Sequence, residues 1–236
     1  MLEIKNLTKS YDGKKNAVDD LSLTINDGEI FGFIGHNGAG KTTTIKCAVG
    51  ILAFDKGEIL IDGKSIKTDP IECKKLIAYI PDNPDLYEQL SAIQYLNFIS
   101  DIYEIDKEER SERIKKYADI FKLSSNLGDL ISSYSHGMKQ KLALISAFIR
   151  EPKLLILDEP FVGLDPKASF DVKELMHELC KKGSSIFFST HVLEVAEKLC
   201  DKVAIIKDGK LVVFGTMEEV KGNKSLEDVF LEQIHE

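Results

Sequence analysis

Residues 29–44 read EIFGFIGHNGAGKTTT, in which a short apolar strand runs into a glycine-rich loop and the start of a helix. Within this stretch, residues 35–42 match GxxxxGK[ST] in the strand–loop–helix setting that marks a phosphate-binding loop. The glycines let successive N–H groups point inward, where a Cβ would obstruct a phosphate, and the helix N-terminus adds a positive dipole. The stretch therefore predicts an α/β fold with a phosphate site at the end of a strand.

The side chains of this loop have separate predicted roles. Lys41 is expected to reach the β- and γ-phosphates of a nucleotide, and the Thr42 hydroxyl is expected to bind Mg²⁺. We assign the His36 imidazole no catalytic role, because loops of this kind tolerate many residues at that position. The residues expected to surround the phosphates are Gly35, His36, Asn37, Gly38, Ala39, Gly40, Lys41, Thr42 and Thr43.

A second predicted site element follows the apolar run Leu154–Leu157. Its first acidic residue, Asp158, stands where a carboxylate at the end of a buried strand can bind Mg²⁺ directly or through water. The next residue, Glu159, is placed to polarise an attacking water. An acidic pair after four aliphatic residues is common, so this interpretation depends on the phosphate-binding loop.

Around these elements the periodicity of the sequence predicts strands and helices in a definite order. Alternation over residues 2–34 predicts antiparallel strands, and helical periodicity from about 85 to 150 predicts a three-helix insertion that begins with a capping box at Ser91. The other predicted elements are hairpins around Asp62-Gly63 and Asp208-Gly209, buried strands at 153–160 and 184–190, a helix capped by Asp165, a helix over VLEVAEKLC, and a short helix capped by Thr216.

These elements predict one domain, residues 1–236, rather than two. Residues 1–84 and 151–236 are expected to form a core with a mainly parallel sheet and an N-terminal antiparallel β subdomain. Residues 85–150 are expected to form a helical subdomain inserted into that core.

The composition limits the classes of function. The chain has 31 Lys and Arg against 39 Asp and Glu, a formal charge of −8, which argues against non-specific binding to nucleic acid or to an acidic lipid surface. No stretch reaches the length of apolar sequence, about 18 to 20 residues, that spans a bilayer, and the N-terminus lacks the apolar core of a signal peptide. The 4 cysteines are scattered without metal-binding spacing, which indicates free thiols in a reducing compartment. We expect a cytosolic protein.

With these residues in place, the sequence resembles the nucleotide-binding subunit of ABC transporters over nearly its whole length. The resemblance consists of seven features in the family's order, and it implies an ATPase with a P-loop NTPase core. The matching positions are Tyr11 for the aromatic that stacks on adenine, Gly35–Thr42 for Walker A, Tyr79–Asp82 for the Q-loop, Tyr134–Gln140 for the signature motif, Leu154–Pro160 for Walker B, Gly163–Pro166 for the D-loop and Ser189–His191 for the switch histidine.

The resemblance also implies how the subunit works. Two chains, either two copies or one copy and a homologous ATPase, pair head to tail in the presence of ATP and Mg²⁺. Ser135 and Gly137, at another helix N-terminus, then contact the γ-phosphate bound by the partner. His191 contacts the γ-phosphate and orients the water with Glu159, while Asp165 links the two sites in addition to its role as a helix cap. The implied partners are integral membrane permease subunits, which place the protein at the cytoplasmic face of the membrane, and no nucleic acid is implied.

Two departures from the family pattern bear on function. The signature has His136 for its first glycine and Met138 for its glutamine, and the strings YSHGMKQKL and SLEDVFLE resemble a bacterial exporter branch that contains drug and antimicrobial-peptide efflux ATPases. The Q-loop has Asp82 in place of glutamine. Its carboxylate could bind Mg²⁺ more strongly or hold off the γ-phosphate until the metal is present, and Asn83 could instead supply the amide.

The sequence leaves alternatives open. A soluble ABC ATPase of iron–sulfur assembly has a similar length, although the signature and the tail argue against it. The substitution at residue 82 also allows a weakly hydrolysing, nucleotide-dependent regulator. Near the Q-loop, Leu86 and Tyr87 are expected to line a groove for a coupling helix of the membrane subunit, whereas Tyr95 and Phe98 are expected to pack inside the helical insertion.

Overall fold

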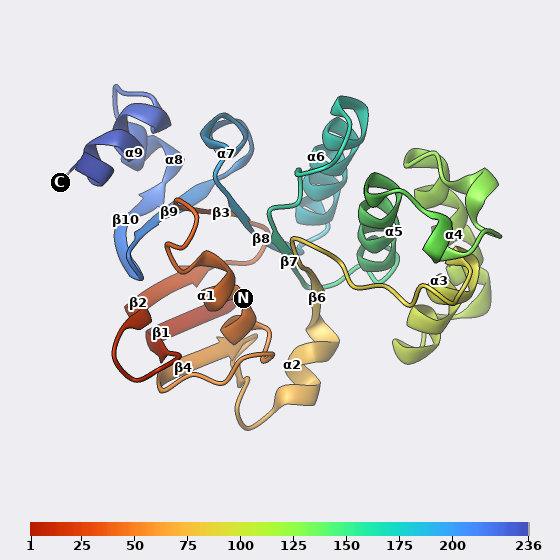
Figure 1. The fold of residues 1–236 in the computed structure, drawn as a ribbon, viewed down its shortest axis with the longest axis horizontal. Helices are drawn as coiled ribbons and strands as arrows, with labels where there is room; N and C mark the ends of the chain where they lie inside the picture. Colours follow the sequence, from red (N-terminus) through yellow and green to blue (C-terminus); the bar gives the residue numbers. More distant parts are fainter. Residues whose placement is uncertain (236) are drawn as a thin grey trace.

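The computed structural model describes residues 1–235, which contain a six-stranded and a four-stranded sheet (Figure 1). The larger sheet has the strand order β10-β9-β3-β8-β7-β6. Its strands β9, β3, β8, β7 and β6 run parallel, and β10 pairs antiparallel with β9. The bounds of these strands are β3 Ile30–Ile34, β6 Ile77–Ile80, β7 Leu154–Asp158, β8 Ser185–Thr190, β9 Lys202–Lys207 and β10 Lys210–Thr216.

The smaller sheet is antiparallel and has the order β2-β1-β4-β5. Its strands are β1 Leu2–Ser10, β2 Asn16–Ile25, β4 Lys56–Ile61 and β5 Lys64–Ser65. The hairpins predicted around Asp62-Gly63 and Asp208-Gly209 both form. The expectation of antiparallel pairing over residues 2–34 is wrong for β3, whose residues are all buried because it lies between two parallel neighbours in the larger sheet.

Apolar residues form two cores, one on each face of the larger sheet. Successive side chains of β7 point to opposite faces of the sheet, so this strand contributes to both cores. Leu155 and Leu157 pack in the core on the side of the helical subdomain. Leu154 and Ile156 pack in the core on the side of the smaller sheet. This two-sided burial explains why β7 reads as a continuous apolar run in the sequence. Helix α1 (Lys41–Ala48) contributes Ile45 to the second core.

The helical subdomain lies at one end of the molecule, as expected (Figure 1). Its helices are α3 Ala92–Ile102, α4 Lys107–Ile120 and α5 His136–Phe148. Ser91 and Gln94 form the predicted capping box of α3. Helices α4 and α5 are joined by the stacked rings of Tyr117 and Phe148, whose centroids are 5.7 Å apart. Arg150 follows α5 and donates to the Ile77 carbonyl oxygen at 2.5 Å, which ties the subdomain to the edge strand β6.

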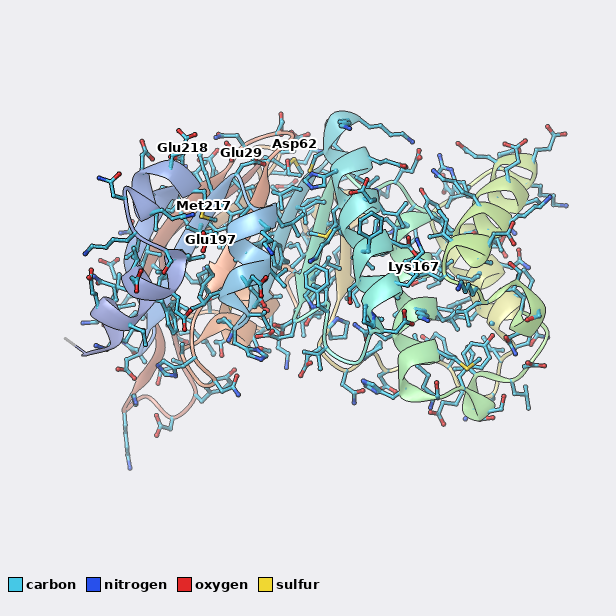
Figure 2. The ribbon with its side chains drawn as sticks, turned by 90° about the horizontal axis from the view of Figure 1, so that it is seen from above. Glu29, Asp62, Lys167, Glu197, Met217 and Glu218 are labelled. Carbon is cyan, nitrogen blue, oxygen red and sulfur yellow. The ribbon has the colours of Figure 1, made fainter. Side chains whose placement is uncertain are left out.

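The C-terminal half of the core carries further helices, α6 Pro166–Lys181 and α7 Leu193–Leu199, both as predicted. After β10 the chain forms α8 (Met217–Lys221), with the predicted capping box at Thr216, and α9 (Leu226–His235). Glu197 of α7 binds the Lys221 ammonium and accepts a hydrogen bond from the Leu226 amide at 3.2 Å. Glu197 and Met217 lie at the end of the molecule opposite the helical subdomain (Figure 2).

Two helices differ from the sequence expectation. Residues 70–76 form α2 (Pro70–Leu76), directly before β6, where the sequence predicts no helix. The C-terminal segment forms α9 in addition to the one short helix predicted there. No helix within residues 1–235 is both long enough and apolar enough to cross a bilayer.

Candidate functional site

The predicted site residues converge because their strands are parallel neighbours. The phosphate-binding loop follows β3, Asp158 ends β7, and His191 follows β8, so all three lie at the carboxyl edge of one sheet. A cleft of about 340 Å³ opens there, and it adjoins a second hollow of about 310 Å³ that reaches Asp208 and Gly209. The cleft is lined by Tyr11, Ala17, His36, Asn37, Gly38, Gly40, Lys41, Thr42, Thr43, Asp82 and Glu159.

Two glycines of the loop are required by its geometry. Gly40 has φ +109°, and a Cβ there would lie 2.5 Å from the Ala17 carbonyl oxygen. A Cβ on Gly35 would lie 2.7 Å from the Ile206 carbonyl oxygen. Because Gly40 also precedes α1, no side chain caps that helix, and its first N–H groups are left for an anion.

Lys41 lies inside the loop rather than in solvent. Its residue is 6% exposed, and its ammonium donates to the Gly35 carbonyl oxygen at 2.7 Å and to the His36 carbonyl oxygen at 3.4 Å. The same Nζ lies 3.4 Å from Oε1 of Glu159, with which it forms an ion pair. The structure thus joins the cation predicted to bind phosphate and the carboxylate predicted to polarise water.

Asp158 is held in place by a serine that our sequence analysis did not select as a site residue. The Ser189 hydroxyl donates to Asp158 Oδ1 at 2.5 Å and accepts from the Glu159 amide at 3.0 Å. The other oxygen, Asp158 Oδ2, is buried without a hydrogen-bond partner among residues 1–235. Ser189 therefore fixes one carboxylate oxygen and leaves the second for a ligand. Its position beside His191 at the end of an apolar strand is the signal that could have identified it.

Glu159 and His191 form a hydrogen-bonded pair at the edge of the cleft. His191 Nδ1 lies 3.0 Å from Glu159 Oε2, and the Glu159 side chain is 13% exposed. Glu159 has φ +51°, a left-handed backbone conformation that residues other than glycine, asparagine and aspartate rarely adopt. Strain of this kind persists where the surroundings over-determine it, and here Ser189 holds the Glu159 amide while Lys41 and His191 hold its carboxylate.

The other predicted residues of the cleft are more exposed. Tyr11 is 66% exposed, and its hydroxyl lies 3.2 Å from Thr43 Oγ1. Tyr11 lines both hollows, together with Ala17 and with Gly38 of the phosphate-binding loop. Thr42 and Asp82 are exposed and line the cleft, whereas Asp158 is only 1% exposed and is not in the lining.

A family model described as ABC transporter matches residues 18–162. The chain belongs to the ABC transporter family. It is 36% identical over 235 residues to the ABC-type transporter ATP-binding protein EcsA of Bacillus subtilis (strain 168), covering 100% of this chain and 95% of EcsA.

Two solved structures have the same fold as this chain. The structure of an ATP-binding subunit of an ABC transporter superposes with a TM-score of 0.95 at 35% identity, covering 99% of both chains. A dimeric, post-hydrolysis structure of the ATP-binding cassette MJ0796 bound to ADP and Pi gives a TM-score of 0.83 at 24% identity, covering 92% of this chain and 99% of that one, which shows the fold alone.

The protein is therefore an ATP-binding subunit of an ABC transporter and an ATPase. A further solved structure, that of cbiO1 from Clostridium perfringens, described as part of the ABC transporter complex cbiONQ, superposes with a TM-score of 0.80 at 27% identity, covering 99% of this chain and 96% of that one. The cleft described above contains residues of the phosphate-binding loop together with Glu159 of the acidic pair.

Seven of the predicted site residues are not in the lining of the cleft. Four of them belong to or adjoin the motifs at the cleft, namely Gly35, Ala39, Asp158 and His191, and the other three, which are expected to act across the pair of chains, are Ser135, Gly137 and Asp165. Ser135 caps α5 and accepts from the Met138 amide at 3.3 Å. Asp165 caps α6 by accepting from the Ala168 amide at 2.9 Å. Its second oxygen binds the ammonium of Lys141 at 2.7 Å, and these bonds, with Lys141 the larger cause, lower the pKa of Asp165 to about 2.

Two of the four aromatic and apolar residues discussed for the groove differ from the expectation in their exposure. Leu86 is 8% exposed, so the expectation that it lines an exposed groove is wrong. Phe98 is 42% exposed, and the expectation that it packs inside the insertion is also wrong. Its ring instead lies beside that of Tyr87, which is 56% exposed, with centroids 5.6 Å apart. Tyr95 is 8% exposed, as expected of a residue packed in the insertion.

Proposed function

We propose that ATP closes two of these subunits head to tail and that hydrolysis reopens the pair. The observation that carries this proposal is the division of the phosphate-binding groups. Lys41 and the N-terminus of α1 face the cleft, whereas Ser135 and Gly137 lie at the start of α5, outside the lining of that cleft. A single chain would bind ATP with half of the expected contacts, and a partner chain facing it would supply the others.

Within the closed pair, each side chain of the cleft has a definite task. Lys41 exchanges its bonds to the loop carbonyl groups for bonds to the β- and γ-phosphates. Glu159, released from that ion pair, orients a water and accepts its proton. His191, hydrogen-bonded to Glu159 in the absence of nucleotide, holds the carboxylate and contacts the γ-phosphate. Tyr11 stacks on adenine over the second hollow.

The residues of the cleft fit Mg²⁺. The buried Asp158 Oδ2 has no partner among the described residues, and Thr42 and Asp82 supply further oxygen donors at the cleft, the ligand type that Mg²⁺ prefers. When bound with ATP, the ion would neutralise charge on the phosphate oxygens. Asp158 would hold it from the strand side, Thr42 from the start of α1, and Asp82 from the Q-loop.

A membrane permease is the partner that we propose for the outer face of the helical subdomain. Tyr87 and Phe98 form an exposed aromatic pair there, and Ile102 of the same helix as Phe98 is 53% exposed. Exposed aromatic residues of this kind are typical of protein interfaces. The exporter-like signature and tail support export as the direction of transport, and with a permease as its partner the subunit would act at the cytoplasmic face of the membrane.

The pairing is tested with Glu159→Gln, which keeps the shape of the side chain but removes the base. We expect this variant to bind ATP, to hydrolyse it at least about a hundredfold more slowly, and to elute as a dimer in ATP but as a monomer in ADP. Lys41→Ala in the same background removes the phosphate contact and is expected to abolish the ATP-dependent dimer. A Glu159→Gln protein that stays monomeric in saturating ATP would contradict the proposal.

The partner and the direction need a separate experiment. The membrane protein that co-purifies with this chain in mild detergent is reconstituted with it in vesicles that carry the subunit outside, so that the exposed face corresponds to the cytoplasm. Export predicts ATP-dependent accumulation inside these vesicles, and Tyr87→Ala with Phe98→Ala is expected to abolish co-purification. ATP-dependent loss of preloaded substrate from the same vesicles would contradict the proposed direction.

A further inference from the structure

The D-loop, residues 163–166, is fastened to helix α5 of the same chain by an ion pair. Lys141 Nζ lies 2.7 Å from Asp165 Oδ2, and the Ala168 amide donates to the other oxygen of that carboxylate at 2.9 Å. Each carboxylate oxygen thus has its own donor, one from α5 and one from α6. The Lys141 side chain is only 19% exposed, although that of Asp165 is 51% exposed.

The backbone of the D-loop also interlocks with the first turn of α5. Gly163 has φ +78°, and a Cβ there would lie 2.9 Å from Cδ2 of the His136 ring. In the other direction, a Cβ on Gly137 would lie 3.1 Å from the Gly163 carbonyl oxygen. The His136 side chain, which replaces a glycine of the family pattern, therefore packs against the D-loop of its own chain.

We propose that Lys141 is a positioning residue that holds the D-loop on α5, so that the two approach the partner's nucleotide as one rigid unit. The inference rests on the head-to-tail pairing proposed above, because Asp165 and Gly137 meet the partner only in that arrangement. A loop that must be ordered during association costs conformational entropy, and a loop that is already held avoids this cost. Lys141 would therefore favour dimer formation without contacting nucleotide.

The alternative is that Lys141 and Asp165 form an ordinary surface ion pair with no role in association. Such pairs contribute about 0 to 1 kcal/mol to folding stability and need not affect association. A matched example is the ion pair between Lys116 of α4 and Glu178 of α6, whose Nζ and Oε2 are 3.4 Å apart. It also joins two helices, but it lies outside the predicted motifs and restrains no loop.

The test measures the protein concentration at half-dimerisation by sedimentation in saturating ATP, with Glu159→Gln as the parent. Adding Lys141→Gln is expected to raise this concentration at least about fivefold, because each of two symmetric copies loses an ion pair. Lys141→Arg is expected to restore the parent value, and Lys116→Gln is expected to leave it unchanged. The ADP affinity of the monomer should be the same in all four proteins.

The outcomes distinguish the inference about Lys141 from the proposed head-to-tail pairing on which it rests. If the parent dimerises and Lys141→Gln does so at the same concentration, the inference is overturned while the pairing stands. If the parent itself does not dimerise, both are overturned. A loss of ADP affinity together with dimerisation in Lys141→Gln would show that Lys141 supports the fold of the cleft instead, and would also overturn the inference.

Discussion

The ion pair between Lys41 and Glu159 makes a quantitative prediction for the nucleotide-free protein. The Lys41 Nζ and Glu159 Oε1 atoms are 3.4 Å apart, and both side chains are largely buried, at 6% and 13% exposure. At this distance and an effective dielectric constant of about 20, the gross attraction is about 5 kcal/mol. The net value is smaller, because both groups lose hydration and Lys41 keeps its bonds to two loop carbonyl groups.

We expect Glu159→Gln to lower the free energy of unfolding of the empty protein by about 2 kcal/mol, which for a chain of this length is a fall in Tm of about 4 to 8 °C. The same change should tighten ADP binding about tenfold, because the phosphate no longer competes with a carboxylate for Lys41. ADP is the suitable ligand, since it lacks the γ-phosphate and head-to-tail closure then makes no contribution.

The assays are thermal unfolding without nucleotide and calorimetric titration with ADP. Glu151→Gln is the control, because Glu151 forms ion pairs with Arg113 and Lys182 beyond the opposite end of β7. This control should lower Tm without changing ADP affinity. If Glu159→Gln weakens ADP binding, or leaves both Tm and affinity as in the parent protein, the reasoning from the ion pair is refuted.

Three further predictions concern other parts of the molecule. Ser189→Ala removes the donor to Asp158 Oδ1 and should cost about 1 to 3 kcal/mol of stability in urea unfolding, with a fall in kcat; unchanged values would contradict the role of Ser189. The pKa of Asp165 lies at about 2 instead of 3.8, so its contribution to stability is complete above pH 3.8 and is lost as the pH falls through about 2. Asp165→Asn should therefore flatten the stability profile in that window, and a profile parallel to that of the parent would argue against it. Leu226→Ala truncates a fully buried side chain in the first turn of α9 and should cost about 2 to 5 kcal/mol, measured by urea unfolding; a negligible loss would mean that the tail packs independently of the core.

The elements that the sequence predicted well are those with a strong local signal. The four aliphatic residues of β7 can only be a buried segment, and Asp165 followed by Pro166 is a clear helix start. Helix α2 gave no such signal, because it has seven residues and buries only Cys73. A single buried position gives no helical spacing of buried residues that the sequence could show.

The candidate site was predictable in its members but not in their pairing. The motif assigns Lys41 to phosphate and Glu159 to water, because it describes the site with nucleotide bound. It contains no information on the ion pair that these two side chains form with each other. Leu86 and Phe98 show a second limit, since hydrophobicity alone does not tell which apolar side chain of a short segment faces outward.

The position of β6 at the edge of the larger sheet has a dynamic consequence. This strand has four residues and pairs only with β7 within the described chain, yet the Q-loop and the helical subdomain both follow it. Local opening of such a strand breaks few hydrogen bonds, so we expect its amides to exchange with deuterium well before those of β3, which is paired on both sides. The helical subdomain, for which we propose a membrane partner, is thus attached at an edge strand that opens easily, three strands away from the phosphate-binding loop.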